Sequence, residues 1–192
     1  MLQLTTRVGI VLRQQKRKPI DGRKGGPVGA TDELALFAEL GAAFAGFIAI
    51  FLIFARREGR FSPADSLRIR SIILASFSAV FISLVPLVLH HAGFSGVALW
   101  RAASTVALIG GLLAGGVVAR KHVTLSPTDR ANVGALHSVI TWGLFAIAAI
   151  LLVSNAFRLV STPSAGPYLA SLVCILGIAA SNFVTIAFQR LL

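Results

Sequence analysis

Long runs of apolar residues, separated by short polar segments, dominate the chain from residue 34 onward. Each run has the roughly 20 residues that a helix needs to cross a bilayer core of about 30 Å. The pattern predicts five membrane spans, at 34–55, 71–89, 97–119, 139–157 and 168–188. Because backbone groups cannot stay without hydrogen bonds in lipid, we expect helices rather than strands. The predicted fold class is therefore an all-α membrane protein.

Composition agrees with this class and leaves little room for a soluble domain. Of the 192 residues, 56% are hydrophobic and only 13% are charged, whereas a soluble domain has about 25% charged residues. We expect residues 31–192 to form one five-helix transmembrane domain. The net charge of +11 comes from basic blocks beside the spans. Such flanks are typical of orientation signals and of contacts with anionic lipid headgroups, so no nucleic-acid partner is expected.

One stretch of sequence occurs twice. "ARREGRFSPAD" begins at Ala55, and "ARKHVTLSPTD" begins 64 positions later, at Ala119. Each stretch joins one predicted span to the next, which indicates a duplicated helical hairpin. We expect two tandem hairpins of the same orientation, spans one–two and three–four, followed by a fifth helix. Such repeats are related by a pseudo-twofold axis along the membrane normal.

Each copy of the repeat contains a helix start signal, Ser-Pro-x-Asp. The Ser hydroxyl and the Asp carboxylate accept hydrogen bonds from amides that the first turn leaves without partners, and Pro suits the first helical position. The signal predicts helix starts at Ser62 and Ser126, with Asp65 and Asp129 completing the caps. A cytoplasmic ligand or partner site at both loops is the alternative, but capping explains these residues without it.

The Lys and Arg residues of the short loops all lie on one side. The loops after spans one and three are basic, whereas "AGFSG" and "STPSAG" carry no charge. Because positive loops remain in the cytoplasm, we expect a multi-pass protein with a cytoplasmic C-terminus. In its general character, with several spans joined by short loops, the chain is similar to small multi-span proteins of the bacterial inner membrane. The bacterial inner membrane is therefore the expected location.

Residues 1–30 differ from the rest of the chain. They contain seven of the 18 Lys and Arg residues and a single acid, Asp21. We expect a basic, disordered leader, and its Arg-rich, acid-poor make-up resembles an organellar transit peptide. The orientation above would require translocation of this basic segment. A further hypothesis is therefore that translation begins near Val28.

Polar side chains gather near the span ends that we predict to face outside. The candidate outer polar cluster comprises Glu39, His90, His91, Arg101, Asn155 and Arg158. An ionisable group in a span costs a few kcal/mol of free energy, so each such group is expected to have a partner or a function. Both Glu39 and Arg101 share helical faces with small residues, which are typical of helix contacts. We expect these two side chains to point inward and form an ion pair. Alternatively, the arginines reach the outer headgroups and the histidines lie at the interface.

A second polar set follows one side of the fifth span. This candidate polar stripe comprises Ser171, Cys174, Ser181, Asn182 and Thr185. Hydroxyl residues in membrane helices are usually packing contacts, but the deep amide of Asn182 needs a partner across a helix interface. The alternative is a water-lined path between the second and fifth spans, which would suit a small transporter or channel.

The sequence contains no motif for a phosphate loop, a metalloprotease, a redox dithiol or a serine nucleophile. Adjacent His90 and His91 point about 100° apart on a helix, which disfavours a shared metal ion. We therefore expect no catalytic residues, no cofactor and no metal, although an enzyme acting on lipid stays open. The first hypothesis is an oligomeric channel or transporter-like protein for a small solute or ion. An oligomer is expected because five helices enclose too little volume for a transport path in one copy. The second is a non-catalytic structural or accessory subunit of a larger membrane complex.

Overall fold

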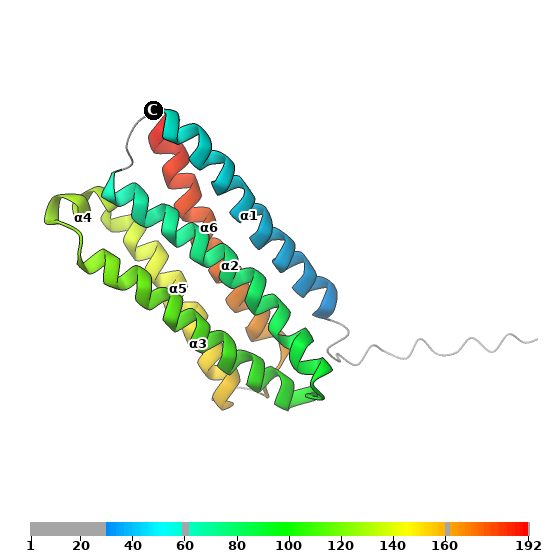
Figure 1. Ribbon diagram of the computed structural model, residues 1–192. Helices are drawn as coiled ribbons and strands as arrows, with labels where there is room; N and C mark the ends of the chain where they lie inside the picture. The colour runs from blue at the N-terminus through cyan, green and yellow to red at the C-terminus, as the bar shows by residue number, and fades with distance from the viewer. Residues whose placement is uncertain (1–29, 59–61, 160–161, 192) are drawn as a thin grey trace, which may run out of the picture.

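The computed structural model describes residues 30–58, 62–159 and 162–191, and these ranges contain helices and no strand (Figure 1). The all-α class is thus confirmed for the described part of the chain. The helices are α1 (Thr31–Glu58), α2 (Pro63–His91), α3 (Gly96–Val123), α4 (Pro127–Val133), α5 (Ala135–Phe157) and α6 (Ala165–Leu191). The predictions about the leader fall on residues 1–29, outside the described residues.

Five of these helices are long and apolar enough to cross a membrane, namely α1, α2, α3, α5 and α6. Each contains one of the predicted spans and extends beyond it at one or both ends. The extension is largest at the start of α2, where the helix begins at Pro63 instead of residue 71. The capping signal had predicted this earlier start.

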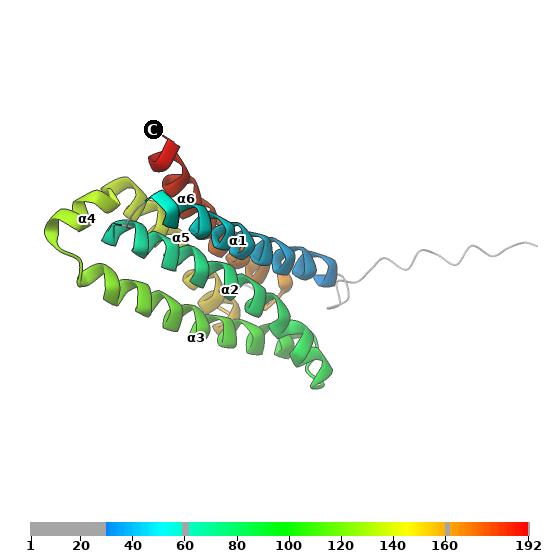
Figure 2. The ribbon, with the colours of Figure 1, turned by 45° about the horizontal axis from the view of Figure 1, so that its top comes forward.

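Four of the long helices form a ring, in the order α2, α3, α5, α6, with each packed against the next. Helix α1 lies outside this ring, against α2 and α6 (Figures 1 and 2). Helix α1, which leads into the first copy of the repeated sequence, is thus peripheral, whereas α3, which leads into the second copy, is a member of the ring. These two helices therefore occupy different places in the bundle.

Basic side chains gather where α2 begins and α3 ends, and we call this the basic end of the bundle. It carries Arg68, Arg70, Arg120, Lys121 and Arg130. The side chains of Arg56, Arg57, Arg60 and Arg190 lie outside the described residues. The far end, where α2 ends and α3 begins, is called the opposite end. It carries His90, His91, Arg101 and Arg158.

Both predicted helix caps are present. The Ser62 hydroxyl accepts a hydrogen bond from the Asp65 amide at 3.1 Å, and the Asp65 carboxylate accepts one from the Ser62 amide at 3.3 Å. The Ser126 hydroxyl accepts one from the Asp129 amide, also at 3.1 Å. The second cap starts the short α4, and the chain breaks at Gly134 before α5. The helix of the fourth predicted span therefore begins at Ala135 and not at Ser126, because Gly134 adopts a φ of 84°, which glycine allows without steric strain.

The contact face of α1 is not the small-residue face beside Glu39. Residues Ala42, Ala43 and Gly46 are exposed. The face that packs on other helices carries large apolar residues at alternating spacings of three and four, with one glycine among them; they are Leu34, Phe37, Gly41, Phe44, Ile48 and Phe51. The inward-facing prediction for Glu39 is therefore wrong, because lipid accepts apolar residues as well as a helix interface does.

Candidate functional site

Arg68 anchors α4 to the bundle. The side chain of Arg68 is only 3% exposed. One guanidinium nitrogen donates to the carbonyls of Asn132 and Val133, both at 3.0 Å, and the other lies 3.5 Å from an Asp65 oxygen. A buried cation is tolerated only when such partners replace water. Sequence reasoning had assigned Arg68 to a basic loop and did not identify this role.

His137, on the first turn of α5, joins α5 to α6 through both ring nitrogens. Its Nε2 atom lies 3.1 Å from Asn182 Oδ1, and its Nδ1 atom lies 3.2 Å from Thr185 Oγ1. The Asn182 Nδ2 group donates to the Ile178 carbonyl at 2.8 Å. This bond orients the amide so that Oδ1, an acceptor, faces the histidine. The partner expected for the deep Asn182 amide is therefore His137.

The Thr185 hydroxyl has two possible partners. It lies 2.8 Å from the Ser181 carbonyl as well as 3.2 Å from His137 Nδ1. When the histidine is neutral and Nδ1 lacks a proton, the hydroxyl can donate to Nδ1. When Nδ1 is protonated, it can donate to the hydroxyl oxygen, which then donates to Ser181. Both protonation states of His137 therefore keep a partner at each ring nitrogen by rotation of one hydroxyl, which gives up its bond to Ser181 when the histidine is neutral.

A small cavity connects these groups at the basic end, and we call it the basic-end cavity. Its polar lining includes Arg68, Ser71, His122, His137, Thr141 and Asn182. His122 Nε2 is buried and has no hydrogen-bond partner among the described residues. The cavity volume of about 20 Å³ suits roughly one water molecule. The cavity thus has space for a water or a proton carrier beside two histidines.

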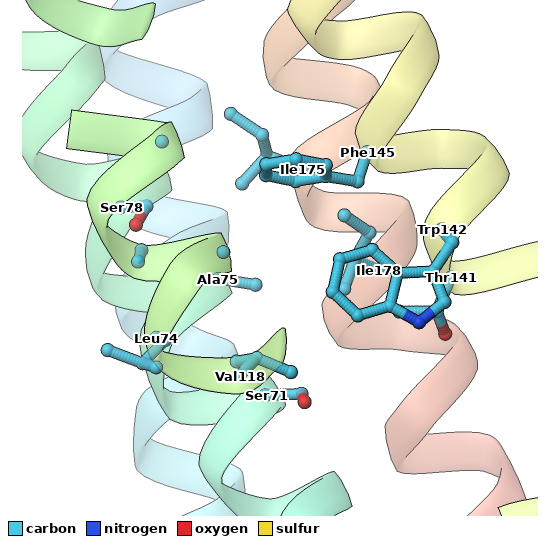
Figure 3. A pocket seen from close by; sticks show the side chains of 13 residues that line it. Ser71, Leu74, Ala75, Ser78, Val118, Thr141, Trp142, Phe145, Ile175 and Ile178 are labelled. Atoms are coloured by element: carbon cyan, nitrogen blue, oxygen red, sulfur yellow. The ribbon is translucent and has the colours of Figure 1, made fainter. Parts of the chain in front are cut away.

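An apolar crevice adjoins the basic-end cavity inside the ring. Its volume is about 70 Å³, and Ser71, Val118, Thr141 and Trp142 line both hollows. In Figure 3, Trp142 and Phe145 of α5, with Ile175 and Ile178 of α6, lie across a gap from α2 side chains. The crevice lining is almost entirely apolar, so the polar chemistry is confined to the basic end.

The predicted outer cluster does not form one site. Asn155 donates to Ser104 Oγ at 2.9 Å and exchanges hydrogen bonds with the Ser164 backbone at 2.9 and 3.1 Å. Arg101 Nε donates to the Ala156 carbonyl at 3.1 Å. These contacts hold α3 and the segment before α6 against the end of α5. They are structural contacts that satisfy a buried amide and a helix C-terminus.

Glu39 and Arg101 do not pair. Glu39 is exposed on α1, and no ion pair links it to Arg101 within the described ranges. The predicted pair is wrong because α1 packs on α2 and α6, whereas α3 packs on α2 and α5.

The remaining members of the cluster are exposed at the opposite end. His90 Nδ1 lies 3.4 Å from the Phe94 carbonyl oxygen and His91 Nδ1 lies 2.8 Å from the Leu87 carbonyl oxygen, so each ring nitrogen, when protonated, can donate to a carbonyl. Arg158 ends α5 in a left-handed conformation, with φ of 57°. Among the residues that the structure describes, no group of three His, Cys, Asp or Glu side chains has the arrangement of a metal site.

The polar stripe of α6 divides into two parts. Ser171 and Ser181 donate to carbonyls of their own helix, at Tyr168 and Ile178, and Cys174 is a half-buried free thiol. Asn182 and Thr185 instead reach α5 at His137. The signal for His137 was present but unused: it lies just before the predicted fourth span, within the region that the Ser126 cap had already predicted to be helical.

Comparison with protein-family models, with curated proteins and with solved structures finds no match to this chain. Function is therefore inferred from the chemistry of the basic-end cavity.

Proposed function

We propose that this protein is an oligomeric channel-like or transporter-like protein for a small ion, and that the ion is the proton. His137 is the proton-binding group in the basic-end cavity. The observation that supports this most strongly is the Thr185 hydroxyl 3.2 Å from His137 Nδ1, because this hydroxyl can donate to the neutral ring or accept from the protonated one. Histidine is also the side chain whose unperturbed titration falls nearest physiological pH.

The cavity has the properties that a proton-transfer step needs. The carboxamide of Asn182 fixes the ring, and the Thr185 hydroxyl follows the proton by rotating. His122 lines the same cavity, and its buried Nε2, which has no hydrogen-bond partner among the described residues, supplies a second proton acceptor. A volume of about 20 Å³ excludes a solute larger than roughly one water molecule. A proton is therefore a better candidate than an organic solute.

The proposal includes a setting in the bacterial inner membrane with a cytoplasmic C-terminus. The basic end then faces the cytoplasm, in agreement with the positive-inside rule. The repeated sequence is interpreted as a duplicated hairpin, α1–α2 and α3–α5. Because one bundle encloses little volume, the part of the path beyond the basic-end cavity forms between two or more copies. No enzyme activity belongs to this proposal.

The test is proton flux into proteoliposomes that contain a pH-sensitive dye, driven by a potassium diffusion potential. Wild-type protein should acidify the vesicles faster than protein-free vesicles do. His137→Gln, which keeps hydrogen bonding but cannot titrate, should reduce the flux to the background. His91→Gln, an exposed histidine at the opposite end, is the matched control and should keep the wild-type rate.

Two results would contradict the proposal. One is wild-type flux no greater than that of empty vesicles. The other is a His137→Gln variant with the wild-type rate. The thermal unfolding of each variant in one detergent shows whether a lost flux reflects lost structure.

A second candidate function is a non-catalytic subunit of a larger membrane complex. It is favoured by Glu39, which lies exposed within the span of α1. An acid that faces hydrocarbon costs free energy. A partner chain that covers Glu39 would remove this cost and so stabilise the complex. Absent proton flux together with a co-purifying protein, lost on Glu39→Gln, would favour this candidate over the first.

A further inference from the structure

A groove runs along α2 at the basic end, between α1 and α3. Its wider part, of about 480 Å³, has an apolar lining made by Leu52, Ile69, Ile73, Leu74 and Val117, together with Ser66 and Arg70. A second hollow of about 290 Å³ adjoins it, since Ser66 and Arg70 line both, and adds Lys121 and Thr124. The groove is therefore apolar along the helices and basic at the end of the bundle.

Arg70 differs sharply from Arg68, two residues earlier on the same helix. Arg68 is buried and bonded to carbonyls of α4. Arg70 is exposed, and within the described side chains it has no hydrogen bond or ion pair. Its planar donors suit an anion with several oxygens, such as a phosphate, and a lysine adds a second charge.

The depth of the two cations suits a lipid headgroup. Arg70 lies seven residues after the start of α2 at Pro63, a rise of about 10 Å along the helix. Lys121 lies in the last turn of α3. Long basic side chains lay their stems on apolar surface and extend their charges to the headgroup level. Both charges can thus meet one phosphate at the membrane surface.

We propose that this groove is a binding site for an anionic glycerophospholipid. Arg70 and Lys121 hold the phosphate, the Ser66 hydroxyl donates to it, and an acyl chain lies along Leu52, Ile73 and Val117. A second copy of this chain is a poorer occupant. It would bring more positive charge to a face that is already basic, in a chain of net charge +11.

The test is native mass spectrometry of the full chain in mild detergent, titrated with phosphatidylglycerol or with phosphatidylcholine of the same acyl chains. Phosphatidylglycerol should bind more tightly. Arg70→Gln and Lys121→Gln should each weaken it about fivefold, and together about 30-fold. Arg120→Gln is the charge-matched control, because Arg120 is exposed beside Lys121 but does not line the groove. It should change the affinity by less than about twofold.

The apolar part of the site needs its own variant. Val117→Trp fills the groove without changing any charge and should weaken phosphatidylglycerol binding by about fivefold or more. Glycerol phosphate at the same concentration should not displace the lipid.

Three results would overturn the proposal: equal affinity for the two lipids, Arg120→Gln as weak as Arg70→Gln, or displacement by glycerol phosphate, which indicates a headgroup-only site. Circular dichroism checks the fold, and Lys121→Gln provides the same test if Arg70→Gln does not fold.

Discussion

At the scale of single residues, the bond between Tyr168 and Ile82 has a clear cause. Pro86 has no amide hydrogen to give to the carbonyl four residues earlier on α2, which belongs to Ile82. The Tyr168 hydroxyl of α6 donates to that carbonyl at 2.6 Å, and the tyrosine is fully buried. The carbonyl that Pro86 leaves without a helical hydrogen bond in α2 is thus satisfied by a side chain of α6.

This geometry makes a prediction for Tyr168→Phe. The variant keeps the ring packing on Trp100, where the ring centroids are 5.6 Å apart, but leaves the Ile82 carbonyl unsatisfied. The free energy of unfolding should fall by about 1–3 kcal/mol. Denaturant unfolding in one fixed detergent measures the change.

The control removes Pro86, the residue that leaves the Ile82 carbonyl without its helical partner. In a Pro86→Ala background the residue-86 amide can bond to Ile82 again, so Tyr168→Phe should become milder by about 0.5 kcal/mol or more. An equal loss in both backgrounds would mean that the proline is not the reason for this bond.

At the scale of helices, single glycines set the closest approaches. An added Cβ on Gly41 of α1 would lie 2.8 Å from the Ser76 carbonyl oxygen of α2, and Val80 and Ala79 are nearly as close. A backbone atom cannot turn aside as a side chain can. The α1–α2 contact therefore requires glycine at this position.

We predict that Gly41→Ala separates α1 from α2 and lowers the free energy of unfolding by about 1–3 kcal/mol, as overpacking typically does. Gly46→Ala is the matched control on the same helix, because no atom lies within 4 Å of its added Cβ. Its effect should stay within about 0.5 kcal/mol of wild type. Unfolding midpoints in one detergent compare the two, and equal effects would place the contact elsewhere.

The helix scale also shows what the sequence could predict. Caps depend on residues three apart, so Ser62 and Ser126 were predicted correctly from local spacing alone. The contact face of α1 could not be predicted in the same way. In lipid, Phe37 and Phe44 can face either a helix or an acyl chain, and the exposed Ala42 and Ala43 resembled a contact face.

At the scale of the whole molecule, the site depends on which helices are neighbours. Asn182 was identified as needing a partner, but its partner is 45 positions away in sequence, on α5. The pairing of Glu39 with Arg101 assumed that α1 and α3 lie side by side. The order of the helices in the ring, with α1 outside it, brings His137 to Asn182 and keeps Glu39 away from Arg101. Neighbour relations between helices of similar hydrophobicity are not encoded in any local pattern.

The sidedness of the bundle decides which compartment the basic-end cavity faces. Within the described residues, the basic end carries Arg68, Arg70, Arg120, Lys121 and Arg130, and the uncharged linker 92–95 between α2 and α3 lies at the opposite end. The positive-inside rule therefore predicts a cytoplasmic C-terminus. A reporter enzyme that is active only in the periplasm should be inactive when fused after Leu192, and active when inserted at Gly93 between α2 and α3. The reverse pattern would place the basic-end cavity and the lipid groove on the periplasmic side. His137 would then take its proton from the periplasm, and Arg70 would bind a lipid of the outer leaflet. The predicted orientation instead gives His137 access to cytoplasmic protons and Arg70 access to lipids of the inner leaflet.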